Sequence, residues 1–163
     1  MDFSIRKAKE ADFGRLNVLF EEIDAYHRNA LPHVFRKPDG PARTLDFLSG
    51  VLADQDAVIL VSETKDQIIG LVYAYLRSLP DIPIRIPVRV IEVDHIVVKQ
   101  EYRRQGVGKA LMEGVHQWAG QIEVDRLELS VWNFNKDAQD FYRRLGYEPA
   151  FIRMWKLWNG TKQ

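Results

Sequence analysis

Residues 100–111 read QEYRRQGVGKAL and lie where a strand-like run of sequence gives way to a helical one. This stretch combines two glycines, Gly106 and Gly108, with three cationic side chains. A simple turn needs one glycine at most, whereas glycines before a helix let the backbone approach a ligand closely. The free N–H groups of the first helical turn then favour an anion. The stretch therefore predicts a diphosphate site, with a tight turn beside a solvated basic face as the alternative.

Two better-known phosphate-binding motifs do not fit this stretch. A P-loop requires GxxxxGK[ST], but Lys109 is followed by Ala110, and Arg103 stands where the first glycine belongs. A dinucleotide fingerprint requires a third small residue, and Leu111 occupies that position. Of the three phosphate-binding motifs, the anion site at a helix N-terminus fits this stretch best.

Composition limits the class of protein. A chain of 163 residues predicts one domain, residues 1–163, and 23 basic against 23 acidic residues give a formal charge of zero. A neutral chain disfavours nucleic acid and anionic lipid as partners. The longest apolar runs, such as 57–61, are far shorter than the roughly 20 residues of a membrane span. Because the first residues do not resemble a signal peptide, we expect no membrane partner and a cytoplasmic location.

Cysteine and histidine usage bears on metals and covalent chemistry. The chain has no cysteine, which excludes disulfides, thiolate metal sites and a cysteine acyl-enzyme. The four histidines show no metal-ligand spacing. We therefore expect no metal.

Hydrophobic periodicity predicts alternating strands and helices. The start and end signals include Asn135 as the N-cap of the last helix and Gly146 as its stop. Strands are expected at 3–8, 57–63, 67–76, 88–98, 127–132 and about 151–157, and helices at 12–27, 45–54, 107–118 and 136–145. This order predicts a single mixed α/β domain without internal repeats.

Residues 103–108, RRQGVG, match the [RQ]-x-x-G-x-[GA] signature of the GNAT family of N-acetyltransferases. The strand 88–98, the strand 127–132 and the block 135–147, NKDAQDFYRRLGY, resemble that family in order and spacing. The resemblance covers about 88–149, and the earlier part of the chain has the family's layout without diagnostic residues. It implies a mostly antiparallel twisted sheet flanked by helices, with the fourth and fifth strands splayed apart.

The resemblance also implies acetyl-CoA as the co-substrate. The end of the 88–98 strand would hold the pantetheine arm, and the glycine-rich loop would hold the diphosphate through main-chain amides and cationic side chains. Asn135 could contact the cofactor in addition to capping its helix. The cofactor-binding residues so implied are Ile96, Val97, Val98, Arg103, Arg104, Gln105, Gly106, Val107, Gly108, Lys109, Asn135 and Tyr142.

Acetyl transfer to an amine requires a base for the amine and an acid for the leaving thiolate. By resemblance, Tyr142 is the general acid, with packing beside Phe141 as its structural alternative. Glu92 and Asp94 are the candidate bases, because an unbroken strand places both on one face. Of the two, Glu92 is slightly favoured. His95 is then expected on the opposite face in a structural role. A β-bulge, common in this family, would change which residue points inward.

The acceptor side is the least legible part of the sequence. Family layout nominates Tyr26, His27, Phe35 and Trp132 as substrate contacts, although each could equally be core. The leading function is transfer of acetyl from acetyl-CoA to a primary amine of a small molecule or peptide by direct attack in a ternary complex. A non-catalytic acyl-CoA sensor is the alternative, and a longer acyl group or a hydroxyl acceptor is a third reading. Trp155 and Trp158 could seed a homodimer.

Overall fold

The computed structural model describes residues 2–156 and 158. The chain divides into two compact units, Met1–Ser130 and Val131–Gln163. The first unit contains a five-stranded sheet. Its strands are β1 (Ser4–Lys7), β2 (Ala57–Glu63), β3 (Ile68–Ser78), β4 (Arg89–Val98) and β5 (Arg126–Leu129).

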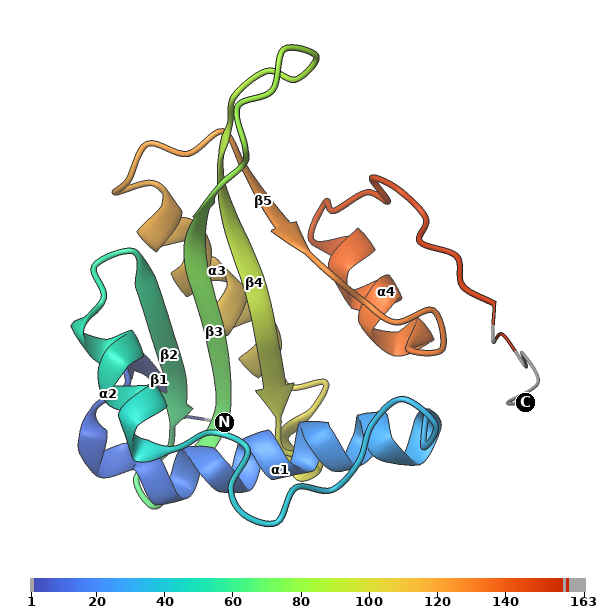
Figure 1. The fold of residues 1–163 in the computed structure, drawn as a ribbon. Coiled ribbons are helices and arrows are strands. Elements are labelled where there is room, and N and C mark those ends of the chain that lie inside the picture. The colour runs from blue at the N-terminus through green and yellow to red at the C-terminus, as the bar shows by residue number, and fades with distance from the viewer. Residues whose placement is uncertain (1, 157, 159–163) are drawn as a thin grey trace. The chain divides into compact units, whose positions relative to one another are not determined.

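The sheet has the order β1-β2-β3-β4-β5 (Figure 1). Its first three pairs are antiparallel, and β4 pairs with β5 in parallel. The β2–β3 hairpin closes where the Thr64 amide donates to the Gln67 carbonyl at 2.9 Å. Strands β2 and β3 lie in the middle of the sheet, and most of their residues are buried. The predicted mixed α/β class with a mostly antiparallel sheet is confirmed.

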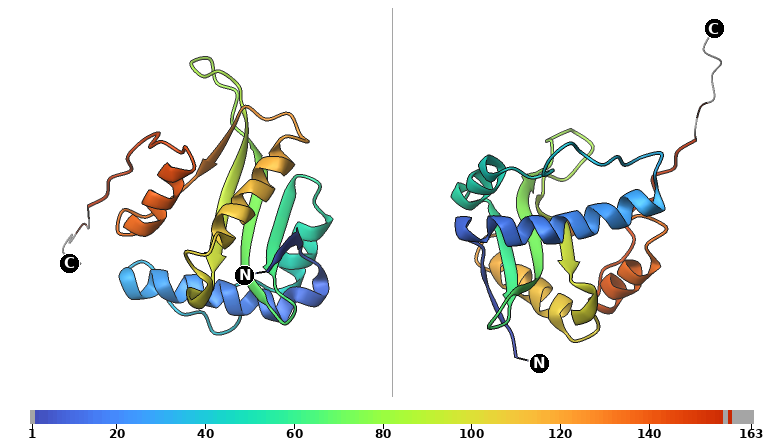
Figure 2. Two further views of the ribbon diagram at one scale, coloured as in Figure 1. Left: turned by 180° about the vertical axis from the view of Figure 1, so that it is seen from behind. Right: turned by 90° about the horizontal axis from the view of Figure 1, so that it is seen from below.

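Helices cover both faces of this sheet. Helices α1 (Phe13–Ala30) and α2 (Leu45–Ala53) lie on one face, and α3 (Val107–Ala119) lies on the other (Figures 1 and 2). Side chains at helical spacing on α1 and α2 pack on the sheet side chains of the first face, forming a core cluster of Leu16, Leu19, Phe20, Leu48, Val51, Ile59, Val61, Leu71 and Val97. Burial of this apolar surface fixes the side chains that project from that face. Short 3-10 turns lie at Glu10–Asp12 and Gln100–Tyr102.

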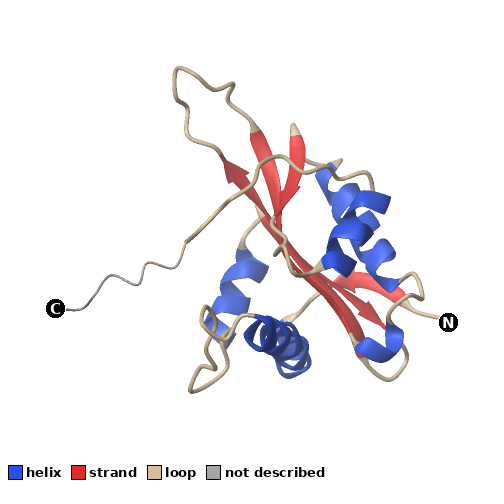
Figure 3. Cartoon of the chain, turned by 90° about the vertical axis from the view of Figure 1, so that its right-hand side faces the viewer, coloured by secondary structure: helices blue, strands red, loops and turns tan. Residues whose placement is uncertain are grey.

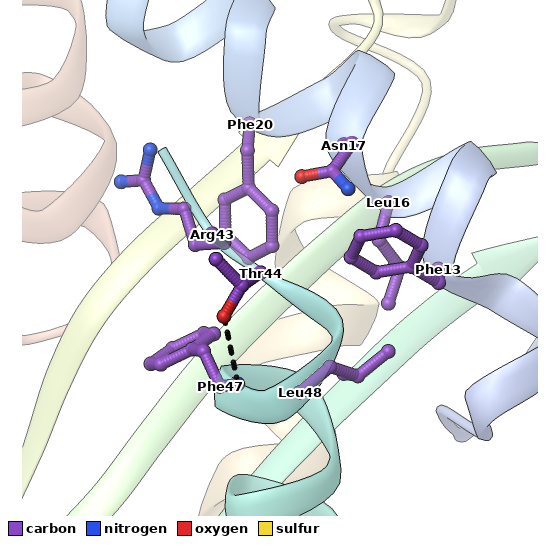
Figure 4. Close-up of a pocket in the computed structure, with 8 residues that line it drawn as sticks. All are labelled: Phe13, Leu16, Asn17, Phe20, Arg43, Thr44, Phe47 and Leu48. Atoms are coloured by element: carbon purple, nitrogen blue, oxygen red, sulfur yellow. Dashed lines mark hydrogen bonds between the residues drawn. The ribbon is translucent and has the colours of Figure 1, made fainter. Parts of the chain in front are cut away.

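Helix α2 begins at a capped terminus beside α1. The Thr44 hydroxyl accepts a hydrogen bond from the Phe47 amide at 3.2 Å (Figure 4). The side chains of Phe13, Phe20 and Phe47 gather between the two helices. The crevice among them measures about 10 Å³, which is room for about one water molecule and not for a substrate.

The second unit contains α4 (Lys136–Arg144), as the sequence predicted. The Asn135 side chain accepts from the Ala138 amide at 3.1 Å, so the expected N-cap is confirmed. The chain leaves the helix at Gly146, whose φ of 88° is a conformation that glycine adopts without strain.

Two strand predictions are wrong. The strand expected at 127–132 ends at Leu129, and residues 151–156 form no strand, while residue 157 lies outside the described part. A strand needs a hydrogen-bonded neighbour, and β5 pairs with β4 over four residues only. Residues that favour β structure were therefore not enough to form a strand at 130–132 or at 151–156. Among the described residues, no helix has the length and apolar character to cross a membrane.

Candidate active site

The cross-strand register of β3 and β4 changes at Asp94. Tyr75 lies opposite Glu92 and Tyr73 lies opposite His95, whereas Ala74 lies opposite Val93, so that Asp94 is an extra residue. This arrangement is a β-bulge. Because opposite residues share a face, Glu92 and His95 project from the same face as Tyr73 and Tyr75.

The bulge overturns the predicted facing of the β4 side chains. His95 lies on the face of Glu92, not on the opposite one, and that face continues to Val97 rather than to Ile96 and Val98. A single inserted residue reverses the alternation beyond it. The α1 side of the sheet therefore receives an imidazole from β4 as well as a carboxylate.

Strands β4 and β5 separate at the same level. Their parallel pairing runs from Val90 and Arg126 to Val93 and Leu129. Residues 94–98 of β4 lie beyond this pairing and extend past the end of β5. The splay that the family resemblance implied is therefore present in the first unit (Figure 1), whose strands are drawn in red in Figure 3.

The glycine-rich loop leads from β4 into α3. Gly106 is the N-cap of α3, with a φ of 87°, and it has no side chain with which to cap the first turn. A Cβ built on Gly106 meets no atom within 4 Å, so the backbone here borders open space. Helix α3 has 13 residues, and its N-terminal amides and dipole favour an anion at this end.

The cationic side chains of the loop differ in their contacts and in their exposure to solvent. Nε of Arg103 donates to the Val98 carbonyl at 2.8 Å, and Nη2 pairs with Glu22 of α1 at 2.9 Å. Lys109 is exposed and lies 3.5 Å from Glu113 on the next turn. The Arg103 side chain therefore connects the loop to β4 and to α1. The Lys109 ammonium instead faces solvent near the start of α3.

Glu92 belongs to a charged row on the first face. Arg77 of β3 pairs with Glu92 at 2.9 Å and with Glu128 of β5 at 2.8 Å. Burial raises the pKa of Glu92, and the Arg77 charge opposes that shift. Glu92 thus has the environment of a proton-accepting carboxylate that is partly neutralised by an ion pair.

A second polar cluster surrounds His95. Nδ1 of His95 lies 2.6 Å from Oδ2 of Asp94, and Nε2 lies 2.6 Å from Nη2 of Arg43. Arg43 also forms an ion pair with Asp24 of α1, and its guanidinium lies 4.7 Å from the centre of the Phe20 ring. The contact with His95 lowers the pKa of Asp94, against the opposing effect of burial.

Three of the predicted acceptor residues lie together at the end of α1. The rings of Tyr26 and His27 are 5.8 Å apart, and those of His27 and Phe35 are 5.5 Å apart. Burial lowers the pKa of His27, which favours its neutral form. The fourth, Trp132, belongs to the second unit, where its ring lies 6.0 Å from that of Trp155.

Tyr142 lies on α4 among aromatic neighbours. Its ring centre is 5.3 Å from that of Phe141 and 5.9 Å from that of Tyr147. Burial raises the pKa of Tyr142 above that of a free phenol and raises the pKa of Tyr147 to about 12. The Tyr142 hydroxyl therefore stays protonated at neutral pH and is able to donate a proton.

The family of the protein follows from comparison of its sequence with family models. The model of the acetyltransferase (GNAT) family matches residues 16–147, which is most of the chain. The protein belongs to the GNAT family. The resemblance carried by residues 103–108 and by the block 135–147 is thereby confirmed.

Curated GNAT relatives share part or most of the chain. The uncharacterized N-acetyltransferase YhfO of Bacillus subtilis is 26% identical over 145 residues, covering 89% of each chain. N-acetyltransferase 8 of Homo sapiens is 24% identical over 69% of this chain and 48% of its own length. Thialysine N-epsilon-acetyltransferase of Bos taurus is 40% identical over 58 residues, which is 36% of this chain and 34% of the relative. The protein thus spans nearly all of YhfO but half or less of the other two.

Solved structures share the GNAT fold. A tetramutant of the BH1408 protein from Bacillus halodurans superposes with a TM-score of 0.88 at 21% identity, covering 95% of this chain and 99% of that one. The aminoglycoside N-acetyltransferase AAC(6')-Iy in complex with CoA gives a TM-score of 0.73 at 15% identity, with 98% and 96% covered. At these identities the likeness concerns the fold alone.

The structure adds residues to this GNAT site that sequence reasoning missed. Arg43 carries no recognisable motif, and His95 was assigned to the wrong face because a bulge leaves no mark in the residue pattern. Of the residues that the structure describes, none form a group of three or more His, Asp or Glu side chains able to hold a metal ion.

Proposed function

We propose that this GNAT protein transfers an acetyl group from acetyl-CoA to a primary amine of a small molecule or peptide, by direct attack within a ternary complex. Relatives named as N-acetyltransferases and a CoA complex of a fold neighbour support acetyl-CoA as the donor. The fold neighbour meta-AAC0020, from an uncultured soil metagenomic sample, was solved with the aminoglycoside sisomicin, which supports an amine-bearing small molecule as the acceptor class.

The observation that carries this proposal is the end of α3. A positive-φ glycine precedes a 13-residue helix, and residues 99–105 connect it to the splayed end of β4. The main-chain amides of Gly106 to Lys109 would bind the diphosphate, and the unpaired part of β4 would bind the pantetheine arm. These residues fit the cofactor because the backbone at Gly106 borders open space rather than packed side chains.

The chemistry would use a base for the amine and an acid for the leaving thiolate. An alkylamine has a pKa near 10 and is almost wholly protonated at pH 7, so a group must take its proton before it attacks the thioester. Glu92, Asp94 and, across the bulge, His95 are the β4 groups available for this step. Tyr142, held protonated by burial, would supply the proton to the leaving thiolate.

Calorimetric titration with acetyl-CoA tests the donor site on the wild type and on Gly106→Glu and Gly106→Gln. Both variants place a side chain of one size at φ 87°, so they share the backbone strain and differ in charge. We expect micromolar binding by the wild type, weaker binding by Gly106→Gln, and a further loss of at least about tenfold in Gly106→Glu, since its carboxylate repels the diphosphate.

Circular dichroism would verify that both variants fold. Equal affinities for the Gln and Glu variants, or no binding by the wild type, would contradict the diphosphate site. A screen of amines for thiol release then separates an enzyme from an acyl-CoA sensor, because a sensor binds acetyl-CoA without releasing thiol.

A further inference from the structure

Two aromatic rings pack against the ring of His95 on the α1 face of the sheet. The Phe20 ring of α1 meets it edge-on with centres 5.7 Å apart, and the Tyr73 ring of β3 stacks on it at 6.5 Å. The imidazole is thereby oriented by packing, so that its two nitrogens face different charged groups.

The partners of the two nitrogens determine where the ring proton lies. Arginine can only donate hydrogen bonds, so Nε2, at 2.6 Å from Nη2 of Arg43, is the unprotonated nitrogen. The single proton of the neutral ring then belongs to Nδ1, which is buried and lies 2.6 Å from the Asp94 carboxylate in a bent approach. His95 therefore presents a lone pair to a cation, with a carboxylate behind the ring.

The two carboxylates on β4 are less suited to receive a proton. Burial raises the pKa of Glu92, but its carboxylate already forms an ion pair with Arg77 at 2.9 Å, which protonation would break. The pKa of Asp94 is lowered by its contact with His95. Imidazole, by contrast, exchanges protons near neutral pH, where proton transfer between amine and base is most effective.

The surroundings of Arg43 form a seat for a cation. They consist of the Asp24 carboxylate, the face of Phe20 and the lone pair of His95. These are the groups that bind an alkylammonium as well as a guanidinium. Arg43 reaches the seat from the connection between α1 and α2, which contains three prolines and no helix or strand.

We propose that the Arg43 guanidinium occupies the subsite of the acceptor's ammonium group, and that His95 takes the ammonium proton through Nε2 when the acceptor displaces Arg43. An N–H bond of the ammonium breaks, its electron pair stays on the amine nitrogen, and a bond forms between Nε2 and the proton. The positive charge passes to the imidazolium, whose Nδ1–H faces Asp94. Asp94 is thus a positioning residue, and the neutral amine is ready to attack. This inference rests on the proposed function.

Several charged or titratable groups other than Arg43 influence this transfer. Asp24 and His27 face it from α1, Tyr73 from β3, and Asp94 from β4 itself. Removal of the Arg43 cation leaves the two carboxylates, which stabilise an imidazolium.

The first test is ¹⁵N NMR of the histidine rings, with the His95 signals assigned from His95→Gln and n-butylammonium chloride as the probe cation. We expect the Nδ1–H tautomer of the neutral ring in the wild type. Butylammonium should shift the Nε2 signal, more strongly in Arg43→Met, and sodium at equal ionic strength should not. An Nε2–H tautomer, or a butylammonium shift that is no stronger in Arg43→Met than in the wild type, would overturn the inference.

The second test is the pH profile of the reaction with whichever amine gives thiol release with the wild type. His95→Gln should lower kcat about 10²-fold or more with little change in acceptor KM, and should remove the acidic limb of the profile. His116→Gln, a histidine of α3 on the other side of the sheet, should leave both unchanged. If Glu92→Gln removes the limb and His95→Gln retains it, Glu92 is the base and this inference fails. Absence of thiol release from the wild type would instead refute the proposed function.

Discussion

Arg103 shows how one side chain of a recognisable motif acquires a tertiary role. Its position in RRQGVG suggested a charge contact with the diphosphate, yet its guanidinium contacts the Val98 carbonyl and Glu22. The arginine thereby connects the glycine-rich loop to α1, the helix that carries Asp24 and Phe20. Its main-chain amide donates to the Gln100 carbonyl at 3.2 Å, so the amides proposed for the diphosphate are those of Gly106 to Lys109.

Tyr142 permits a test of the proposed acid at the scale of one atom. Tyr142→Phe removes the hydroxyl and keeps the ring that packs on Phe141 and Tyr147. We expect kcat to fall about 10²-fold, because general acid catalysis commonly contributes that much, while the affinity for acetyl-CoA and the melting temperature change little. Steady-state thiol release, calorimetry and thermal unfolding measure the three quantities.

Tyr147→Phe is the matched control for Tyr142→Phe, since it removes a hydroxyl from the neighbouring tyrosine of the same aromatic cluster. An undiminished kcat in Tyr142→Phe would show that Tyr142 serves packing alone.

At the scale of elements, the approach of α3 to the sheet depends on residues without side chains. A Cβ on Gly70 of β3 would lie 3.0 Å from the Val97 carbonyl oxygen and 3.2 Å from a Leu111 methyl of α3. A Cβ on Gly114 of α3 would lie 2.7 Å from a Leu60 methyl. These two glycines let the helix pack closely on the sheet, which places the start of α3 near the end of β4.

Gly70→Ala should therefore destabilise the protein. We expect the free energy of unfolding to fall by about 1–3 kcal/mol, because the backbone carbonyl of Val97 cannot move as a side chain can. Urea unfolding followed by circular dichroism measures this change. Gly50→Ala, on α2 with no atom near its Cβ, is the control and should add about 0.5–1 kcal/mol. A neutral Gly70→Ala would mean that the sheet and α3 move apart to admit the added methyl group at no cost in stability.

At the scale of the whole molecule, a buried ion-pair network joins the N-terminal strand to the sheet and α1. The Asp12 carboxylate is fully buried and accepts from Arg6 at 2.7 Å and from the Lys9 amide at 3.0 Å. Arg15 pairs with Asp12, and Glu63 of β2 pairs with Arg6 at 2.6 Å. Burial alone would raise the pKa of Asp12, but these hydrogen bonds and charges outweigh it, and the pKa is lowered.

This lowered pKa makes stability depend on pH. A carboxyl with a lower pKa in the folded than in the unfolded state stabilises the fold fully above the unfolded pKa, near 4, and loses that contribution as the pH falls through the folded value. Asp12→Asn leaves Arg6 without its buried partner and should lower the free energy of unfolding at pH 7 by about 3 kcal/mol. The difference between variant and wild type should shrink below pH 4.

Urea unfolding at pH 7 and at pH 3 measures this dependence. Asp39→Asn, in the exposed connection between α1 and α2, is the control and should change stability by no more than about 0.5 kcal/mol. A deficit in Asp12→Asn that is the same at both pH values would mean that the Asp12 charge does not stabilise the fold.

The sequence by itself determined the features that neighbouring residues encode. The Asn135 cap, the glycine-rich turn before α3 and the order of elements as far as α4 follow from residues close in sequence, and the structure confirms them. The tertiary structure alone decided where β5 ends, which face His95 takes and what Arg43 contacts. These features depend on cross-strand register and on helices distant in the chain: the insertion of Asp94 is visible only against its partners on β3, and the Arg43 seat forms only when α1, its connection and β4 come together.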